Sequence, residues 1–427
     1  MIQLRYRNVE IRGISLRNLA DYIPLVFTTS YISYTILTTF LKEIFTYSCP
    51  SMYLYIYGSA ISTLLLAVSI ILGASVSGLY LDHLWRTGRG FRILTILLLS
   101  SSILFTTYVV TTRGLSHEMF ISTNAIFWFI TGFLLGNLLT NTSLYIRYIY
   151  DVMKRGTTVG VGVGLGALLH LGLAASGLNV ALLITTCLIL STLSATSLLA
   201  HEKLRSGKYS ERVVNEGVSL YDMRVLMLLI PIYIFSLMHG LIIRSHILPH
   251  ARVLLADVVL NELVMNLPML MSVLAGIVMD SFGRKVVGIA GLIVLGITSV
   301  FMLTIYTLII PPIEISILTL IFSRLSAALI TPYIMILSAE IAPKKFAGKF
   351  LSICYGTTAA GVLTGVVTPD ILKSFYLPTA VGAMILFTSV YILYTLPETL
   401  PPEYLRRKEI ISYIKKAMKL KGKSRSS

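Results

Sequence analysis

Long apolar segments recur along almost the whole sequence. Twelve runs of about 20 residues or more carry few charges, at residues 18–40, 53–80, 91–112, 119–150, 157–177, 178–200, 225–247, 254–279, 286–310, 313–340, 349–370 and 375–397. About 20 apolar residues in a helix cross a ~30 Å hydrocarbon core. Lipid offers the backbone no hydrogen-bond partners, so each crossing segment must be helical. We predict an all-α membrane protein with twelve spans.

The composition agrees with a membrane protein. Hydrophobic residues make up 56% of the chain and charged residues only 13%, whereas a soluble domain carries about 25% charged residues. The mean hydropathy is +0.83. Too little polar surface remains to cover a water-soluble body.

The net charge of +16 follows the membrane topology. If residue 1 is cytoplasmic, all but six of the 35 lysines and arginines lie in or beside cytoplasmic segments; the six are Lys42, Arg113, Arg244, Arg252, Arg324 and Lys373. This is the positive-inside asymmetry, and it argues against nucleic acid as a partner. We expect a multi-pass protein of the plasma membrane with both termini in the cytoplasm.

Four regions follow from the spacing of the spans. We predict a six-helix bundle at residues 1–200, a cytoplasmic linker at 201–224, a second bundle at 225–397 and a basic tail at 398–427. Apolar residues recur near helical period in the tail, with lysines and arginines between them. Such a helix is expected to rest on the anionic inner leaflet.

A short motif occurs once in each predicted half. In the second half Gly276 precedes Asp280 by four residues, and Gly283, Arg284 and Lys285 follow. In the first half Gly78, Asp82 and Arg86 keep the same spacing, but Trp85 occupies the position of Gly283. Arg89, after Gly88, is a second candidate for the basic position. A duplicated motif between long apolar segments indicates a transporter built from two related halves.

These motifs resemble those of the major facilitator superfamily, with a leaning toward its sugar-porter or general-metabolite branch. That family carries G-x-x-x-D-x-x-G-R-[RK] after spans 2 and 8. It also carries E-x-x-P-x-x-x-R-G after spans 4 and 10, which Glu340, Pro343 and Gly348 match in the second half. In the first half Arg155 and Gly156 match, while Tyr148 replaces the glutamate. Sugar porters also carry motifs at the ends of spans 6 and 12. Here the end of span 6 matches in part, through Glu202, and the end of span 12 matches in full, as Pro397-Glu398-Thr399. The glutamine pair typical of span 7 in sugar porters is missing.

The resemblance implies two pseudo-symmetric six-helix bundles around a central cavity. The acids and bases of the motifs would meet at cytoplasmic helix ends, where helix N-termini attract carboxylates and C-termini attract cations. Our hypothesis is that they hold the outward-facing state closed on the cytoplasmic side. The predicted gate residues are Asp82, Arg86, Arg89, Arg155, Glu202, Asp280, Gly283, Arg284, Glu340 and Glu398.

Small residues spaced four apart mark spans 2, 5, 8 and 11. They include Ser69, Gly73 and Ser77 in span 2, Gly160 and Gly164 in span 5, Ser272 and Gly276 in span 8, and Gly361 and Gly365 in span 11. Such spacing lets helix backbones approach closely in lipid. We predict that these four helices form the contact between the halves.

Arg324 is the most informative polar residue inside a predicted span. It lies 16 positions before Glu340, about 24 Å along a helix at 1.5 Å per residue. Placing arginine near the bilayer centre costs about 2.5–3.5 kcal/mol on insertion scales. It could bind an anionic solute, pair with a coupling carboxylate, or fix helix register as a buried ion pair.

Other polar residues within the spans complete a candidate binding site. Glu262 is the best candidate proton carrier, with Asp257 nearer the outer mouth. The further substrate-binding candidates are Asn266, His239, Tyr233, Asn137, Asn141 and His170. A lone histidine in a helix is more often a packed, hydrogen-bonded residue than a titrating one.

No enzymatic signature is visible. The sequence lacks a Walker loop, an H-E-x-x-H motif and a Cys/His cluster at ligand spacing, so we expect neither an enzyme nor a cofactor or metal site. We predict secondary transport of a small polar or anionic solute, a sugar or a carboxylate, by symport with a proton or another ion. A monomer is the default expectation. The alternatives are an efflux pump for amphipathic compounds and a non-transporting membrane sensor.

Overall fold

The computed structural model describes residues 24–26, 28, 52–111, 117–150, 152–175, 180–205, 223–242, 263–264, 266–307, 313–343, 346–371, 386–387, 389–394 and 399. The helices of the first half are α3 (Met52–Arg86), α4 (Gly90–Thr111), α5 (His117–Ile149), α6 (Arg155–Ala175) and α7 (Val180–Arg205). Those of the second half are α8 (Met223–Ile242), α11 (Met271–Phe282), α12 (Arg284–Thr307), α13 (Ile313–Ile341) and α14 (Ala347–Ile371). Short 3₁₀ turns lie at η2 (Val152–Lys154) and η4 (Leu267–Leu270).

These helices follow predicted spans 2 to 11 in order. Six of them, within the described residues, are long and apolar enough to cross a membrane, and three shorter apolar helices accompany them. Predicted spans 1 and 12 are described only around Leu25 and Leu386. The prediction of an all-α, multi-pass membrane fold is confirmed.

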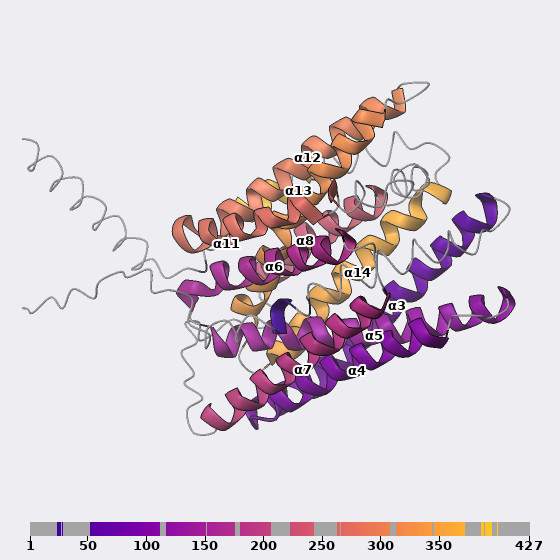
Figure 1. The fold of residues 1–427 in the computed structure, drawn as a ribbon. Coiled ribbons are helices and arrows are strands. Elements are labelled where there is room, and N and C mark those ends of the chain that lie inside the picture. Colours follow the sequence, from indigo (N-terminus) through magenta and orange to yellow (C-terminus); the bar gives the residue numbers. More distant parts are fainter. Residues whose placement is uncertain are drawn as a thin grey trace, which may run out of the picture.

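The helices are arranged in two groups with a seam between them. In Figure 1, α3, α4, α5 and α7 gather on one side and α11, α12 and α13 on the other. The helices α6, α8 and α14 run between these groups. Across the seam, α3 packs on α14 and α6 packs on α11. The predicted contact between the halves through spans 2, 5, 8 and 11 is therefore confirmed.

Individual small residues divide between two kinds of contact. At the seam, a Cβ on Gly276 would lie 2.3 Å from the carbonyl oxygen of Gly156, and one on Gly160 would lie 2.2 Å from that of Ser272. In contrast, Gly73 packs on α5 within its own half, and Gly365 packs on α8. Those two glycines serve packing inside a half, which spacing alone did not distinguish.

Helix α3 is longer than the hydropathy predicted. It continues to Arg86 rather than ending near residue 80, so Asp82 and Trp85 lie on its last turns. Span 8 is interrupted instead: the turn η4 carries Pro268 in its first positions and precedes α11. Proline has no backbone N–H to continue an α-helix.

At one end of the molecule, α3, α5, α11 and α13 finish and α4, α6, α12 and α14 begin. We call this the basic end. It carries Arg86, Arg147, Arg155, Arg284 and Lys349. Residues from both halves meet there, and the candidate gate residues lie among them.

Candidate functional site

Asp280 caps a helix of the opposite half. One carboxylate oxygen accepts a hydrogen bond from the backbone N–H of Gly156 at 2.9 Å, and the other accepts from Thr157 at 2.6 Å. These N–H groups belong to the first turn of α6, where no intrahelical partner exists and the helix dipole is positive. A Cβ on Gly156 would lie 2.6 Å from Oδ1 of Asp280. A larger residue at position 156 would therefore displace the carboxylate.

Arg284 joins the same carboxylate to the neighbouring helix. Its side chain is fully buried and is bonded through Nη1 to Asp280. Through Nη2 it donates to the carbonyl oxygen of Val152 at 2.6 Å and to Glu340 at 3.3 Å. Gly283, with a φ of 114°, turns the chain between α11 and α12 just before it. That backbone conformation is one that glycine adopts without steric cost.

Glu340 is shared between the two halves. Its Oε1 lies 3.5 Å from Nη1 of Arg155, which belongs to the first half. Oε2 accepts a hydrogen bond from Oγ1 of Thr399 at 2.6 Å. Glu398 lies outside the described residues, so of the Pro397-Glu398-Thr399 motif the structure places the threonine in this network. Buried ion pairs of this kind leave a costly uncompensated charge when one partner is removed.

Arg147 makes a second connection across the halves that the sequence did not predict. It lies at the end of α5 and donates from Nη1 to the carbonyl oxygens of Ala342 at 2.5 Å and Ala339 at 3.2 Å. These carbonyls end α13, where a cation is favoured by the helix dipole. The carbonyl oxygen of Arg147 itself accepts from Nη2 of Arg155 at 2.7 Å.

Asp82 repeats the helix cap on the other side of the seam. Its Oδ1 accepts a hydrogen bond from the backbone N–H of Gly348 at 2.7 Å, in the first turn of α14. The charges of Arg86 and Lys349 act on this carboxylate. Asp82 and Asp280 therefore hold equivalent positions, each capping a helix of the other half.

The surroundings of Asp82 differ from those of Asp280. Trp85, at the position of Gly283, is 1% exposed. Its ring stacks on Tyr148 with centroids 5.3 Å apart, and its Nε1 donates to Oδ1 of Asn141 at 2.6 Å. Tyr148 holds the position equivalent to Glu340. An aromatic stack inside the first half thus stands where the second half has an arginine–glutamate pair.

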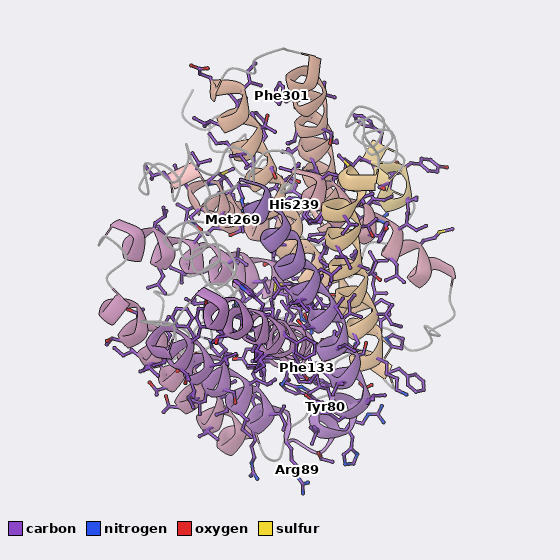
Figure 2. The ribbon with its side chains drawn as sticks, turned by 90° about the vertical axis from the view of Figure 1, so that its right-hand side faces the viewer. Tyr80, Arg89, Phe133, His239, Met269 and Phe301 are labelled. Carbon is purple, nitrogen blue, oxygen red and sulfur yellow. The ribbon has the colours of Figure 1, made fainter. Side chains whose placement is uncertain are left out.

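Neither basic candidate of the first motif is buried like Arg284. Arg86 and Arg89 are both exposed, and Arg89 projects from the end of the molecule in Figure 2. Gly88 has a φ of 77° and turns the chain between α3 and α4, as Gly283 does between α11 and α12. The first loop, residues 87–89, is therefore two residues longer than the second, which is Gly283 alone, and the arginine after its glycine is exposed.

The central polar residues lie away from this network. His239 on α8 has both ring nitrogens shielded from solvent, and neither has a hydrogen-bond partner among the described residues. Its ring packs against Phe235 at 4.7 Å, and the charge of Arg324 on α13 acts on it. Figure 2 shows His239 within the helical bundle. The structure therefore brings two of the predicted binding residues into one region.

Other predicted binding residues already have structural partners. Asn137 accepts from the hydroxyl of Tyr80 at 2.6 Å and donates to the carbonyl oxygen of Phe133 at 2.9 Å. Tyr233 donates to Oγ1 of Thr364 at 3.1 Å, which joins α8 to α14. The Oδ1 atom of Asn141 accepts a hydrogen bond from Nε1 of Trp85, and its Nδ2 is buried without a partner in the described part of the chain. Asn266 is 4% exposed.

Several predicted residues cannot be placed. Asp257 and Glu262 lie outside the described residues, as does the tail 398–427 apart from Thr399. His170 and Glu202 lie on described helices, but their side chains are outside the description. Within the part that the structure covers, no three His, Cys, Asp or Glu side chains come together as a group that could hold a metal ion.

Comparison with known proteins identifies the fold. Residues 238–403 match the family described as "Sugar (and other) transporter". No curated protein sequence shows a significant match to the chain. Solved structures match at low identity over most of the chain.

One such structure is the proton:xylose symporter XylE, whose organism is E. coli, with bound 6-bromo-6-deoxy-D-glucose. It is 16% identical, covers 90% of this chain and 95% of its own, and has a TM-score of 0.64. A bacterial homologue of the iron transporter ferroportin is 12% identical, covers 89% and 99%, and has a TM-score of 0.59. The human organic anion transporter MFSD10 is 14% identical, covers 88% and 98%, and has a TM-score of 0.59. The chain therefore shares the fold of these solved transporters over most of its length, and its sequence over residues 238–403 is similar to the sugar transporters.

Proposed function

We propose that this chain is a secondary active transporter that moves a small polar or anionic organic solute, a sugar or a carboxylate, by alternating access. The observation that carries the proposal is the pair of reciprocal helix caps at the basic end. Asp82 caps α14 and Asp280 caps α6, so each half holds a helix N-terminus of the other. The two contacts across the seam, α3 with α14 and α6 with α11, can separate together if the halves tilt as rigid bodies.

The conformation that fits these contacts is outward-facing. The caps, the Arg155–Glu340 pair and the bonds from Arg147 all join the halves at the basic end. The positive-inside asymmetry favours the cytoplasm for that end, and we propose the plasma membrane as the site of action. The gate residues would then close the cytoplasmic side and release it when solute binds.

The pair His239 and Arg324 supports a polar or anionic solute. A buried histidine whose two ring nitrogens lack partners leaves hydrogen-bonding capacity for a ligand. Arg324 on α13 adds a positive charge that acts on this histidine. The names of two solved relatives, a proton:xylose symporter and an organic anion transporter, agree with this range of solutes.

Proton coupling is the proposed source of energy. One elementary charge crossing 100 mV gains about 2.3 kcal/mol, which is roughly a 50-fold concentration ratio. Glu262 remains the proposed proton carrier, with Asp257 as the second candidate.

The test is solute counterflow in proteoliposomes. Sugars and carboxylates are first screened by their effect on thermal unfolding of the purified protein, and the best are assayed with wild type, Arg324→Gln and His239→Ala. The matched control is Arg92→Gln, an exposed arginine at the basic end. We expect both central substitutions to lower apparent affinity, Arg324→Gln most strongly for a carboxylate, and an inward proton gradient to drive accumulation. Flux of amphipathic dyes alone would favour the efflux pump, and no flux of any solute would contradict transport.

A further inference from the structure

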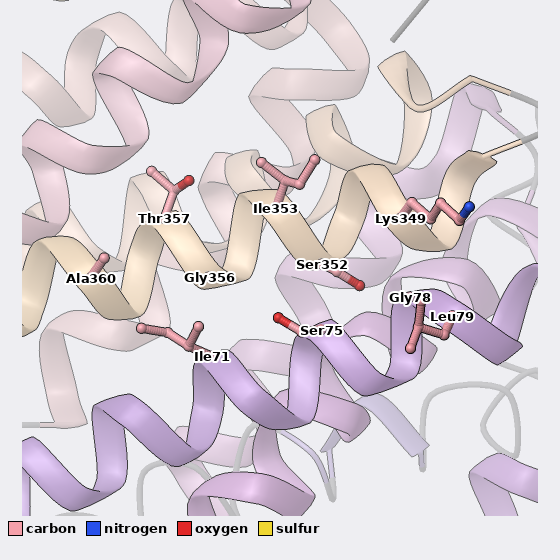
Figure 3. Close-up of a pocket in the computed structure, with 10 residues that line it drawn as sticks. All are labelled: Ile71, Ser75, Gly78, Leu79, Lys349, Ser352, Ile353, Gly356, Thr357 and Ala360. Atoms are coloured by element: carbon pink, nitrogen blue, oxygen red, sulfur yellow. The ribbon is translucent and has the colours of Figure 1, made fainter.

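A groove runs along the seam between α3 and α14. It has a volume of about 450 Å³ and is lined on α3 by Ile71, Ser75, Gly78 and Leu79, and on α14 by Lys349, Ser352, Ile353, Gly356, Thr357 and Ala360. Figure 3 shows the two helices side by side, with Ile71, Ser75 and Ser352 in the space between them. The volume lies within the range of about 300–1,000 Å³ typical of ligand pockets.

The helices touch at one end of the groove and leave space farther along. A Cβ on Gly78 would lie 2.4 Å from Oγ of Ser352, so the backbones are in close contact there. One turn farther along α14, a Cβ on Gly356 would meet nothing within 4 Å. The space beside Gly356 is therefore open, although it lies between two tightly packed halves.

The walls of the groove face the lipid. Leu79 is 76% exposed and Ile353 is 45% exposed, and both belong to helices long and apolar enough to span a membrane. Exposed aliphatic side chains on such helices contact acyl chains rather than water. From Lys349 to Ala360 the groove follows twelve residues of α14, about 16 Å for the eleven steps at 1.5 Å each. That length is close to one leaflet, half of a ~30 Å hydrocarbon core.

Positive charge lies where the groove reaches the basic end. Lys349 is exposed, and its Nζ lies 5.4 Å from the ring centroid of Phe346, itself 41% exposed. Arg86 is the second cation at this corner, since both charges act on Asp82. These two cations outnumber the single Asp82 carboxylate, so the three side chains together carry a net positive charge.

We propose that the groove binds an anionic phospholipid of the inner leaflet. Its phosphate lies against Lys349, and one acyl chain runs along α14 past Ile353 and Gly356. The lipid then fills a space between the halves that exists only while α3 and α14 are in contact. Bound lipid would favour that closed arrangement, because a ligand stabilises the state that binds it best.

Retention of lipid by the purified full-length chain tests this directly. The protein is reconstituted in liposomes of equal parts phosphatidylglycerol and phosphatidylcholine, extracted in mild detergent, and its bound lipids are counted by native mass spectrometry. Lys349→Gln removes the charge, and Gly356→Leu fills the groove at the position where a Cβ meets open space. The controls are Lys154→Gln, an exposed lysine at the same end, and Ile297→Phe, which adds bulk at an exposed position of α12.

We expect wild type and both controls to retain phosphatidylglycerol in preference to phosphatidylcholine. Lys349→Gln should lower that retention about fivefold, the value of one lysine near an anionic surface. Gly356→Leu should lower it about tenfold or more. If Gly356→Leu does not give monodisperse protein, Ala360→Leu blocks the same groove one turn farther along.

Three results would overturn the proposal. They are equal retention of the two lipids by wild type, equal losses in Lys154→Gln and Lys349→Gln, and undiminished retention when the groove is filled. Lipid retention needs no transport activity. A failure of the proposed transport function would therefore leave this measurement intact.

Discussion

A buried carboxylate that caps a helix of the opposite half ties the two halves together through the backbone. The Asp280 carboxylate accepts hydrogen bonds from two backbone N–H groups of α6 and from the guanidinium of Arg284, and Asp280 is only 6% exposed. Hydrogen bonds to charged groups contribute about 1.5–3 kcal/mol each. The negative charge also balances Arg284, which is fully buried. A change at this one residue therefore affects a helix cap and an ion pair together.

Asp280→Asn should abolish transport while leaving membrane insertion intact. The amide keeps one acceptor but presents an N–H₂ group to the N–H groups of α6, and Arg284 loses its nearest counter-charge. Breaking one partner of a buried ion pair costs about 3–5 kcal/mol, enough to depopulate the closed basic end. Initial uptake rates in proteoliposomes, normalised to monodisperse protein, give the measurement. Normal uptake by this variant would contradict a role for Asp280 in the gate.

Trp85 offers a second test, of stability rather than transport. Trp85→Phe keeps an aromatic ring on Tyr148 but leaves the Asn141 oxygen without its donor, a loss of about 1–3 kcal/mol. Trp85→Ala also removes the buried ring, and such changes cost about 3–5 kcal/mol. We expect thermal unfolding in detergent at successively lower temperatures in the order wild type, Trp85→Phe, Trp85→Ala. Tyr391→Ala, at a ring that is 69% exposed, is the control; equal unfolding temperatures throughout would refute the aromatic stack as a stabilising contact.

Residues differ in how far the sequence could predict them. Asp280, Arg284 and Glu340 match a motif whose chemistry implies an ion-pair network, and the structure brings them together. Arg147 bonds to backbone carbonyls, which carry no residue signature, so its partners are invisible in the sequence. Trp85 and Tyr148 each replace a residue of the family motifs. Their rings stack on one another, and the sequence could not show this because it depends on how the helices pack.

At the scale of helices, hydropathy predicted the elements well and their ends less well. The break between spans 5 and 6 is present, with α6 ending at Ala175 and α7 beginning at Val180. Helix α3 exceeds its apolar segment because Asp82, His83 and Arg86 continue the helix beyond the hydrophobic run. Hydropathy measures the lipid-facing length, whereas the helix ends where Gly88 turns the chain.

The seam between α6 and α11 predicts a strong effect of side-chain size. In Gly276→Leu the new Cβ would lie 2.3 Å from the carbonyl oxygen of Gly156, which is backbone and cannot rotate away. The helices must separate, and the Asp280 cap is lost with them. We expect loss of transport and faster labelling of a cysteine placed at Thr157. Gly356→Ala, where a Cβ meets open space, is the matched control and should behave as wild type; equal labelling of the two variants would show that this close contact is dispensable.

For the whole molecule, the cross-half bonds of the basic end should set the balance between two conformations. Arg147→Gln removes the two bonds to the end of α13 and leaves the hydrogen bonds of both helix caps in place. Two hydrogen bonds to a charged group amount to about 3 kcal/mol or more, so the ratio of closed to open molecules should fall about tenfold or more even if water recovers half of that. Arg147→Lys keeps a hydrogen-bond donor, so its closed-to-open ratio should lie between those of wild type and Arg147→Gln.

Distances between spin labels at Lys154 and Phe346 measure that balance. Both side chains are exposed at the basic end, one in each half, and Cys49, Cys187 and Cys354 are replaced first. We expect one short distance in wild type and a growing long-distance population in Arg147→Lys and then Arg147→Gln. Since the caps and the Arg147 bonds act on the same two-state motion, Asp280→Asn should populate the same long distance. A distribution that is unchanged in all three variants would mean that the halves do not separate at this end, and alternating access through it would have to be abandoned.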